Sequence, residues 1–167
     1  MAALSILQYP DPRLKLVAKQ VDKFDAALEG LCADMLQTMY ESDGVGLAAT
    51  QVNVQQRLFT LDLSITKNQP LCIINPKILA SHDSIVWEEG CLSFPGVYAK
   101  VTRSAELTLE YSDIHGEQHI LQADGLLAVC IQHELDHLDG ITFFDHLSSL
   151  KRRMLRNKLE KLRERAT

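Results

Sequence analysis

The sequence predicts an α+β fold, with mainly antiparallel β-sheets around one central buried helix and further helices near the N-terminal and C-terminal ends. Two observations predict this class. Apolar residues follow helical spacing in early and late segments, whereas short runs rich in β-forming residues lie between them. The chain of 167 residues is 46% hydrophobic and 23% charged, which suits a single domain over residues 1–167.

The N-terminal segment predicts an extended arm followed by one amphipathic helix. Tyr9-Pro10-Asp11-Pro12-Arg13 favours an arm and a turn, because residues before proline prefer extended backbone. From about Asp25 to Glu41 the apolar side chains recur at helical spacing, which predicts a helix. The cluster Ser42-Asp43-Gly44 is typical of a chain break and predicts the end of this helix.

Several short runs rich in β-branched and aromatic residues predict strands. These runs are Arg57–Asp62, Leu71–Ile74, Ser84–Glu88, Leu107–Tyr111 and Gln118–Leu121. Asn75-Pro76 predicts a break after the second run. The turn Asp113-Ile114-His115-Gly116 joins the last two runs, so we expect them to form a hairpin.

The C-terminal third predicts a buried helix, a short strand and a second helix. Leu126–Gln132 is almost wholly apolar and continues as a helix that ends near Asp139-Gly140, with Asp124 as its N-cap. Ile141–Phe144 is a short apolar run that predicts one more strand. Residues from about 148 to 165 predict a basic helix, with Ser148 or Ser149 as its cap.

The buried helix contains the motif His133-Glu134-Leu135-Asp136-His137. Residues four apart share one helical face, so the two imidazoles can converge on one divalent cation. The carboxylate between them can handle protons beside that cation, which predicts metal-assisted attack by water. The alternative is a pair of core or surface histidines with no ligand.

Two histidines do not complete a catalytic metal site, which usually has three protein ligands and a water. His146, beyond Gly140, could supply the third ligand only if the chain turns back. Cys91, in Glu89-Gly90-Cys91-Leu92-Ser93, could supply a thiolate, although a buried thiol is the commoner role of a cysteine. Spacing alone leaves both candidates open.

The segment Gly44-Val45-Gly46-Leu47-Ala48-Ala49-Thr50-Gln51 is rich in small residues, which let backbone approach a ligand closely. The Gln51 amide could donate a hydrogen bond to a developing oxyanion. A tight loop with small residues for packing is the alternative interpretation.

Three segments, Gly44–Gln51, Glu89–Ser93 and Gln132–His137, resemble the signature motifs of the peptide deformylase family, in the family's order. The arm Tyr9–Leu14 and the helical tail resemble the common bacterial type. The family removes the formyl group from the N-terminal formylmethionine of newly made proteins and releases formate. The resemblance therefore implies a single catalytic domain and a metal-dependent amide hydrolase acting on nascent formylmethionyl peptides.

The resemblance also implies roles for individual residues. The metal ligands would be Cys91, His133 and His137. Glu134 would be the general acid/base, while the Gln51 amide and the backbone N–H of Leu92 would hold the oxyanion. Family members most often use Fe²⁺ natively, and Zn²⁺, Ni²⁺ or Co²⁺ can occupy the site.

We expect an apolar pocket for the methionine side chain. Its candidate residues are Val45, Leu126, Val129 and Cys130, with Gly46 offering backbone to the peptide, and core packing is the alternative for the three helix residues. Glu89 and Arg103 are expected to form a supporting ion pair behind the Cys91 loop. One departure from some bacterial members is the lack of an arginine within Phe94–Tyr98, where those members use one to hold the substrate backbone.

Two other classes of function are compatible with parts of the pattern. A metallopeptidase could share only the two histidines and the glutamate, and a non-enzymatic protein could bind the ribosome through its basic tail. Net charge is −5 overall, yet Lys151–Thr167 has eight Lys or Arg and two Glu, giving +6 against −11 elsewhere. One interpretation is a solvated helix that packs Met154, Leu155, Leu159 and Leu162 on the body. The other is that this helix also docks on an anionic surface such as RNA.

The remaining features predict a cytoplasmic protein without membrane contact. No apolar run reaches the length of a membrane span, and Met1–Ser5 lacks the pattern of a secretory signal. No disulfide-like spacing relates the four cysteines, Cys32, Cys72, Cys91 and Cys130. A reducing compartment is therefore expected.

Overall fold

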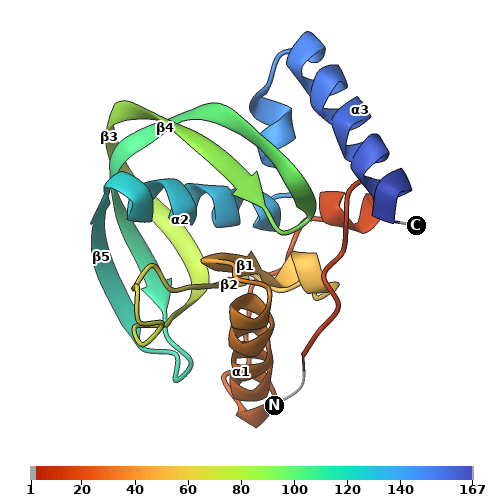
Figure 1. The fold of residues 1–167 in the computed structure, drawn as a ribbon. Helices are drawn as coiled ribbons and strands as arrows, with labels where there is room; N and C mark the ends of the chain where they lie inside the picture. Colours follow the sequence, from red (N-terminus) through yellow and green to blue (C-terminus); the bar gives the residue numbers. More distant parts are fainter. Residues whose placement is uncertain (1–2, 167) are drawn as a thin grey trace.

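The computed structural model describes residues 3–166 and confirms the predicted α+β class (Figure 1). The expected domain over 1–167 also includes residues 1, 2 and 167, which lie outside the described residues. The α-helices of the described part are α1 (Ala26–Glu41), α2 (Gly125–Leu138) and α3 (Ser149–Ala166). The strands are β1 (Gly46–Ala48), β2 (Leu58–Leu61), β3 (Leu71–Cys91), β4 (Phe94–Ser112) and β5 (Gln118–Asp124). Short 3-10 helices are η1 (Pro12–Lys15), η2 (Ala49–Val52) and η3 (Phe143–His146).

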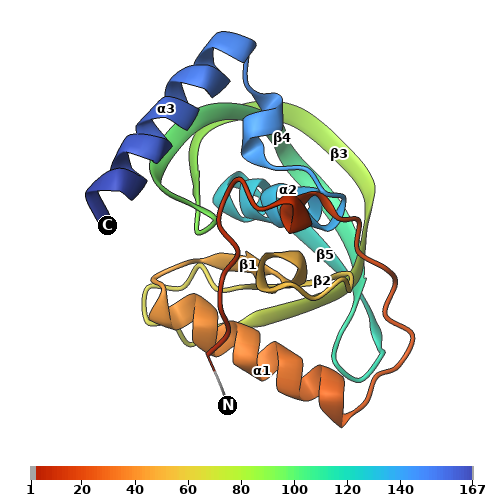
Figure 2. The same ribbon diagram turned by 90° about the vertical axis from the view of Figure 1, so that its right-hand side faces the viewer.

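The strands form one antiparallel sheet in the order β1-β2-β3-β4-β5, so each strand pairs with its neighbour in sequence. The pair β4–β5 is the predicted hairpin, with Leu109 opposite Leu121. Figures 1 and 2 show that the sheet bends around α2, which lies between the β3–β5 part and the short strands β1 and β2. The sheet therefore encloses the predicted central helix.

Alternation along β2 explains how the short strands separate α2 from α1. Phe59 and Leu61 pack in the core cluster that contains Ala128 and Ile131 of α2. Leu58, on the opposite face, packs in a second cluster with the buried methionines of α1. Because successive side chains of a strand point to opposite faces, one strand serves both cores.

A third core cluster lies under α3. Phe94 of β4 packs with Phe143 and Phe144 of η3, and α3 contributes the buried residues Leu155 and Leu159. Leu162 is partly buried against the same cluster, but Met154 is 56% exposed. The expectation that Met154 packs on the body is therefore wrong, because its side chain stands on the solvent face of the helix.

Two predicted strands are parts of one longer strand. Leu71–Ile74 and Ser84–Glu88 both belong to β3, and Asn75-Pro76 does not end it. The pairing register shifts between Ile74 and Lys77, and Asn75 has a positive φ of 52°. A bulge tolerates a proline that cannot donate to the sheet, which explains why the strand continues. β4 likewise begins at Phe94, well before the predicted Leu107.

Three predictions at element ends have different outcomes. The prediction of a strand at Ile141–Phe144 is wrong, since the chain forms η3 there and Asp145 accepts a hydrogen bond from the Thr142 backbone. Asp124 is the N-cap residue of α2, but its side chain makes no capping bond. Ser148 does cap α3, because its hydroxyl accepts a hydrogen bond from Lys151 N at 3.2 Å.

Cys32 of α1 and Cys72 of β3 are paired as a disulfide, which the sequence spacing did not predict. The two residues are 40 positions apart, and they meet because α1 packs against this part of the sheet. Cys91 and Cys130 are free. Among the described residues, no helix combines the length and the apolar character needed to cross a membrane.

Candidate active site and metal centre

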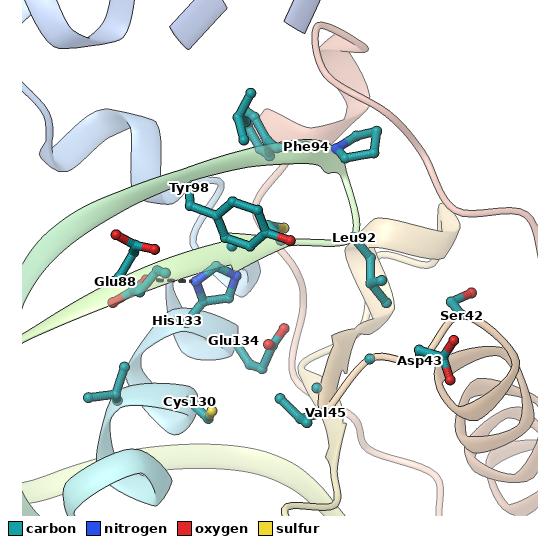
Figure 3. Close-up of a pocket in the computed structure, with 18 of the residues that line it drawn as sticks. Ser42, Asp43, Val45, Glu88, Leu92, Phe94, Tyr98, Cys130, His133 and Glu134 are labelled. Atoms are coloured by element: carbon teal, nitrogen blue, oxygen red, sulfur yellow. Dashed lines mark hydrogen bonds and ion pairs between the residues drawn. The ribbon is translucent and has the colours of Figure 1, made fainter. Parts of the chain in front are cut away.

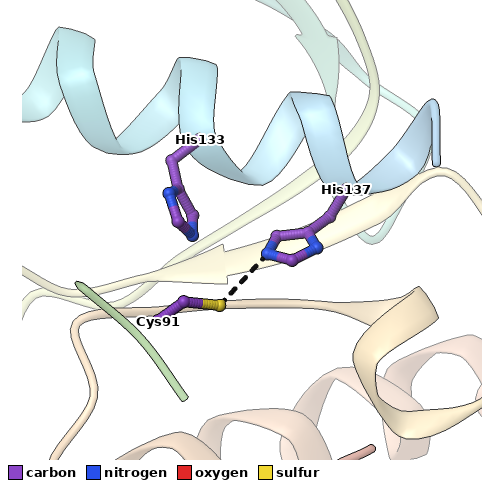
Figure 4. Close-up of side chains that lie close together, drawn as sticks. All are labelled: Cys91, His133 and His137. Atoms are coloured by element: carbon purple, nitrogen blue, oxygen red, sulfur yellow. Dashed lines mark hydrogen bonds between the residues drawn. The ribbon is translucent and has the colours of Figure 1, made fainter. Parts of the chain in front are cut away.

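One thiol and two imidazoles cluster where α2 meets the end of β3. One ligand atom from each of Cys91, His133 and His137 lies within 4.8 Å of the other two. Cys91 Sγ is 3.3 Å from His137 Nε2, and Figure 4 shows both rings above the sulfur. The two histidines are 7% and 0% exposed, whereas Cys91 is partly buried.

Local structure explains why these side chains converge. His133 and His137 stand one turn apart on α2, so they share a face of the helix. Other faces of α2 are fixed in the core by Ala128 and Ile131, which are fully buried. Cys91 is the last residue of β3 and pairs with Phe94 across a tight connection to β4. The strand end therefore delivers the sulfur to the buried helix.

The third member of the cluster is Cys91 rather than His146. His146 Nε2 lies 2.8 Å from Asp136 Oδ2, on another side of α2, and the residue is not part of the cluster. Sequence spacing could not distinguish the two candidates, because the choice depends on where the hairpin ends in space.

The donor set fits a divalent cation of borderline softness. A thiolate and two imidazoles are ligands that zinc and ferrous iron accept. In the described part of the chain, Glu134 Oε1 is buried without a hydrogen-bond partner. Buried polar atoms generally have partners, so this oxygen indicates a place for a polar guest beside the cluster. A cation with its water is such a guest.

A buried ion pair orients one of the imidazoles. His133 Nδ1 is 2.9 Å from Glu89 Oε1, which leaves Nε2 free to face the cluster. Arg103 donates two hydrogen bonds to the same carboxylate, at 2.8 and 2.9 Å, so the expected pair is present. Burial alone would raise the pKa of Glu89, but Arg103 and His133 more than offset it and hold that pKa at about 2. Glu89 is therefore ionised when it contacts the ring.

Burial separates the pKa values of the other groups. It raises the pKa of Glu134 to about 7, although His133 and Arg103 act in the opposite direction. Burial and the neighbouring positive charges hold the pKa of His137 well below its ordinary value. For His133, burial is outweighed by hydrogen bonds to Cys91 and Glu89 and by the Glu134 charge, so its pKa is raised. With a pKa of about 7, the Glu134 carboxyl can exchange a proton near neutral pH.

The Gln51 amide lies beside the Cys91 loop. Its Nε2 donates to Ser93 Oγ at 3.0 Å and approaches Cys91 Sγ at 3.5 Å, while its Oε1 accepts from Ala48 N at 2.9 Å. The side chain is 1% exposed. The predicted oxyanion donor is therefore held rigidly, with its NH₂ group at the cluster.

Two glycines explain how the β1 segment approaches the other catalytic candidates. A Cβ at Gly46 would lie 2.5 Å from Glu134 Oε2, and one at Gly44 would lie 2.6 Å from Leu92 Cδ1. The small residues thus let this segment approach two side chains of the protein, and its predicted approach to a ligand stays a prediction. Figure 3 shows Glu134 and Leu92 on either side of this segment.

A cavity of about 530 Å³ opens beside the cluster, and all five predicted pocket residues line it. They are Val45, Gly46, Leu126, Val129 and Cys130. Val129 and Cys130 are only 2% and 8% exposed, so the core-packing interpretation also holds for them in part. Burial raises the pKa of the Cys130 thiol to about 12, so this wall stays neutral.

Sequence reasoning missed the outer wall of the cavity. Trp87 and Glu88 of β3 and Tyr98 of β4 line it, and Figure 3 shows the Tyr98 ring above His133. Trp87 and Tyr98 are 39% and 59% exposed, although both are aromatic. The signal available in the sequence was that both aromatic residues lie within seven positions of the predicted Cys91 ligand. Within the described residues no lysine or arginine lines this cavity, in keeping with the missing arginine.

The chain matches known proteins along its whole length. A family model described as polypeptide deformylase matches residues 3–153. A peptide deformylase of Xylella fastidiosa (strain M12) is 51% identical over 170 residues, which cover 100% of both chains. One of Neisseria meningitidis (serogroup C, strain 053442) is 51% identical over 161 residues, or 96% of each chain.

Solved structures share the fold at substantial identity. The crystal structure of a peptide deformylase from Legionella pneumophila has a TM-score of 0.95 and 45% identity, covering 98% of this chain and 96% of that one. The Ehrlichia chaffeensis enzyme in complex with actinonin has a TM-score of 0.92 and 39% identity, covering 96% and 98%. The chain therefore belongs to the polypeptide deformylase family, the metal-dependent hydrolases that remove the N-formyl group from nascent polypeptides.

Proposed function

We propose that Cys91, His133 and His137 hold one divalent cation and that Glu134 is the general acid/base of formyl hydrolysis. The observation that supports this most is the cluster of three ligand atoms within 4.8 Å of one another, next to the buried and unpartnered Oε1 of Glu134. The proposed unit is a single catalytic domain.

We propose Fe²⁺ as the native metal because the family most often uses it, with Zn²⁺, Ni²⁺ and Co²⁺ as substitutes that thiolate and imidazole ligands also accept. When bound, it supplies Lewis acidity that polarises the formyl oxygen and lowers the pKa of a water from about 15.7 toward 7. The Cys91 thiolate adds negative charge and softness to the site. It also makes the site sensitive to oxidation, so we expect activity to be lost in air when iron is the metal.

Glu134 moves the proton. Its Oε2 lies against Gly46 and its Oε1 faces no protein donor, so the carboxylate is free to accept a proton from water. Burial, which raises its pKa to about 7, makes it equally able to return that proton to the leaving amine nitrogen. One group thus serves as base and then as acid.

The Gln51 Nε2 group and the backbone N–H of Leu92 are the proposed oxyanion donors. Gln51 is supported by its fixed position, since Ala48 N and Ser93 Oγ hold both ends of the amide. A preorganised donor costs no reorganisation when charge develops on the formyl oxygen.

The substrate is a nascent chain that begins with formylmethionine. We assign the apolar side of the cavity, made by Val45, Leu126, Val129 and Cys130, to the methionine side chain, and Gly46 to the peptide backbone. A flexible, apolar thioether suits such a pocket. Glu89 and Arg103 serve as structural support, because Glu89 contacts the His133 ring and Arg103 holds the Glu89 carboxylate.

The decisive experiment is Glu134→Gln assayed for formate release from a formyl-Met peptide. The variant keeps shape and metal but loses proton transfer, so we expect turnover to fall by about 10²- to 10⁴-fold at unchanged metal content. Glu88→Gln, another acid lining the cavity, is the matched control and should retain turnover. Unchanged turnover in Glu134→Gln would refute the acid/base role. An acetyl-Met peptide, run in parallel, would be cleaved only by a general peptidase.

We also propose that α3 contacts the ribosome and that the protein works in the cytoplasm, where nascent chains emerge. Arg152 donates to Leu147 O and Arg156 donates to the Tyr9 hydroxyl, so both have intramolecular contacts. Charge reversal of Arg152, Arg153 and Arg156 would therefore also disturb packing. Reversal of the exposed cations Lys151, Arg153 and Lys158 is cleaner. It should weaken co-sedimentation with ribosomes and spare activity on short peptides, and equal co-sedimentation would contradict the contact.

A further inference from the structure

A continuous line of hydrogen bonds leads from the metal cluster to a histidine at the surface. It begins at His133 Nδ1, 2.9 Å from Glu89 Oε1, and Glu89 is bound in turn by Arg103. Arg103 Nη1 also donates to Asp136 Oδ2 at 2.6 Å. His146 Nε2 lies 2.8 Å from the same Asp136 oxygen and 3.4 Å from Arg103 Nη1. The line therefore ends at His146, outside the cluster and its cavity.

The middle of this line is an arginine shared by two carboxylates. The Arg103 side chain is 4% exposed, and it bridges Glu89, which is 3% exposed, to Asp136, which is 21% exposed. A buried guanidinium with five donors is fixed only when its donors are used. Asp136 is one of the two residues that the H-E-x-x-H pattern leaves unspecified, and Arg103 fixes its carboxylate through a hydrogen bond.

His146 completes the outer end. It belongs to η3, whereas Asp136 belongs to α2 and Arg103 to β4, so the contact ties three elements together. It lines a separate cavity of about 440 Å³ with Ser84, Thr102, Ser104 and Gln132. His133 and Glu134 line the substrate cavity but not the cavity beside His146. Replacing His146 therefore leaves the substrate's surroundings intact.

We propose that Asp136 and His146 are positioning residues for the metal site, acting on the His133 ring through Arg103 and Glu89. The inference rests on the proposed function, in which His133 is a metal ligand. His146 holds the Asp136 carboxylate, Asp136 holds one edge of Arg103, and Arg103 presents its other edge to Glu89. Outer partners of a ligating imidazole fix its tautomer and orientation and raise its basicity as a ligand.

The test measures cobalt binding to metal-stripped protein by competition with a chelator. For His146→Ala and Asp136→Asn we expect the dissociation constant for Co²⁺ to rise about tenfold, at the lower end of the effect of outer partners. The absorption spectrum of the cobalt form should change with it. His146→Gln keeps a nitrogen near the position of Nε2 and should restore both quantities to within about twofold of wild type.

His82→Ala is the control, since His82 is an exposed histidine of β3 that does not line the cavity beside His146. It should leave cobalt affinity and spectrum unchanged. Thermal unfolding of the metal-stripped variants separates positioning from simple support. A lower unfolding temperature with unchanged cobalt affinity and spectrum overturns the proposal, as does no change in any of the three. If wild-type protein binds no cobalt through Cys91, the proposed function itself fails, which is a different outcome.

Discussion

The carboxylate of Glu134 lies directly against the backbone of Gly46: a Cβ at that glycine would stand 2.5 Å from Oε2 and 3.0 Å from Leu61 Cδ2. Gly46→Ala should therefore push the Glu134 side chain out of place. We expect kcat/KM to fall at least about tenfold, since a displaced acid/base loses part of its 10²- to 10⁴-fold contribution. Metal content, measured alongside, should remain that of wild type.

Gly30→Ala is the matched control for that substitution. Gly30 lies on the exposed face of α1, where an added Cβ meets nothing within 4 Å. Replacement of a helical glycine in open space stabilises a protein by about 0.5–1 kcal/mol. Urea unfolding should show this gain with unchanged activity. Equal activity losses in the two variants would show that the Gly46 effect is not local to Glu134.

Gln51→Ala should lower kcat by about 10²- to 10³-fold without loss of the metal, the usual consequence of removing one oxyanion donor. Part of any effect could come from the hydrogen bond between Gln51 Nε2 and Ser93 Oγ, at 3.0 Å. Ser93→Ala removes that bond and keeps the amide. Because Ala48 N still holds the amide, Ser93→Ala should cost less than Gln51→Ala, and a wild-type kcat in Gln51→Ala would contradict the oxyanion role.

Glu134 should cost the metal-stripped protein stability at alkaline pH. Burial raises its pKa from the ordinary 4.5 to about 7, so folding favours the neutral carboxyl and opposes the ionised one. Glu134→Gln should therefore be more stable than wild type above pH 7, by an amount on the order of 3 kcal/mol. The difference should shrink as pH falls toward 4.5. Unfolding curves at several pH values test this, and a pH-independent difference would contradict it.

A second pair of titratable groups joins α1 to the end of β2. The Tyr40 hydroxyl donates to Asp62 Oδ2 at 2.5 Å, and burial together with this bond raises the Tyr40 pKa from 10.0 to about 12. The neutral phenol is thus favoured in the folded state. The hydrogen bond from Tyr40 to Asp62 therefore stabilises the fold fully below pH 10, and this stabilisation is lost as pH rises toward 12.

Tyr40→Phe should consequently be less stable than wild type at pH 8, by about 0.5–1.5 kcal/mol for one hydrogen bond. The two unfolding free energies should converge between pH 10 and 12. A gap that stays constant over that interval would show that the hydroxyl contributes nothing through Asp62.

The sequence predicted α2 and its face of two histidines, because helical periodicity of 3.6 residues can be recognised from a short stretch of neighbouring residues. It did not predict the full length of β3 and β4. The middle of β3, around Ser81–Ser84, is exposed on both sides, so no alternation marks it as a strand. Asn75-Pro76 and Pro95-Gly96 resemble breaks, yet the sheet bulges or bends at these places.

In the candidate site too, residues of a local motif could be predicted, whereas residues brought together by folding could not. The motif gave His133, Glu134 and His137, but residue spacing left Cys91 and His146 as equal candidates for a third ligand. Family resemblance favoured Cys91, and the hairpin end places its sulfur beside the rings. The Cys32–Cys72 pair and the aromatic wall at Trp87 and Tyr98 depend on packing between distant segments, which no local pattern reveals.

Cobalt binding by wild-type protein and by Cys91→Ser tests the metal centre directly. We predict one Co²⁺ per wild-type chain, with an absorption band from thiolate-to-cobalt charge transfer. Cys91→Ser should lose that band and bind cobalt more weakly. A wild-type cobalt form without the thiolate band, or an unchanged band in Cys91→Ser, would contradict the assignment of Cys91, His133 and His137 as the metal centre.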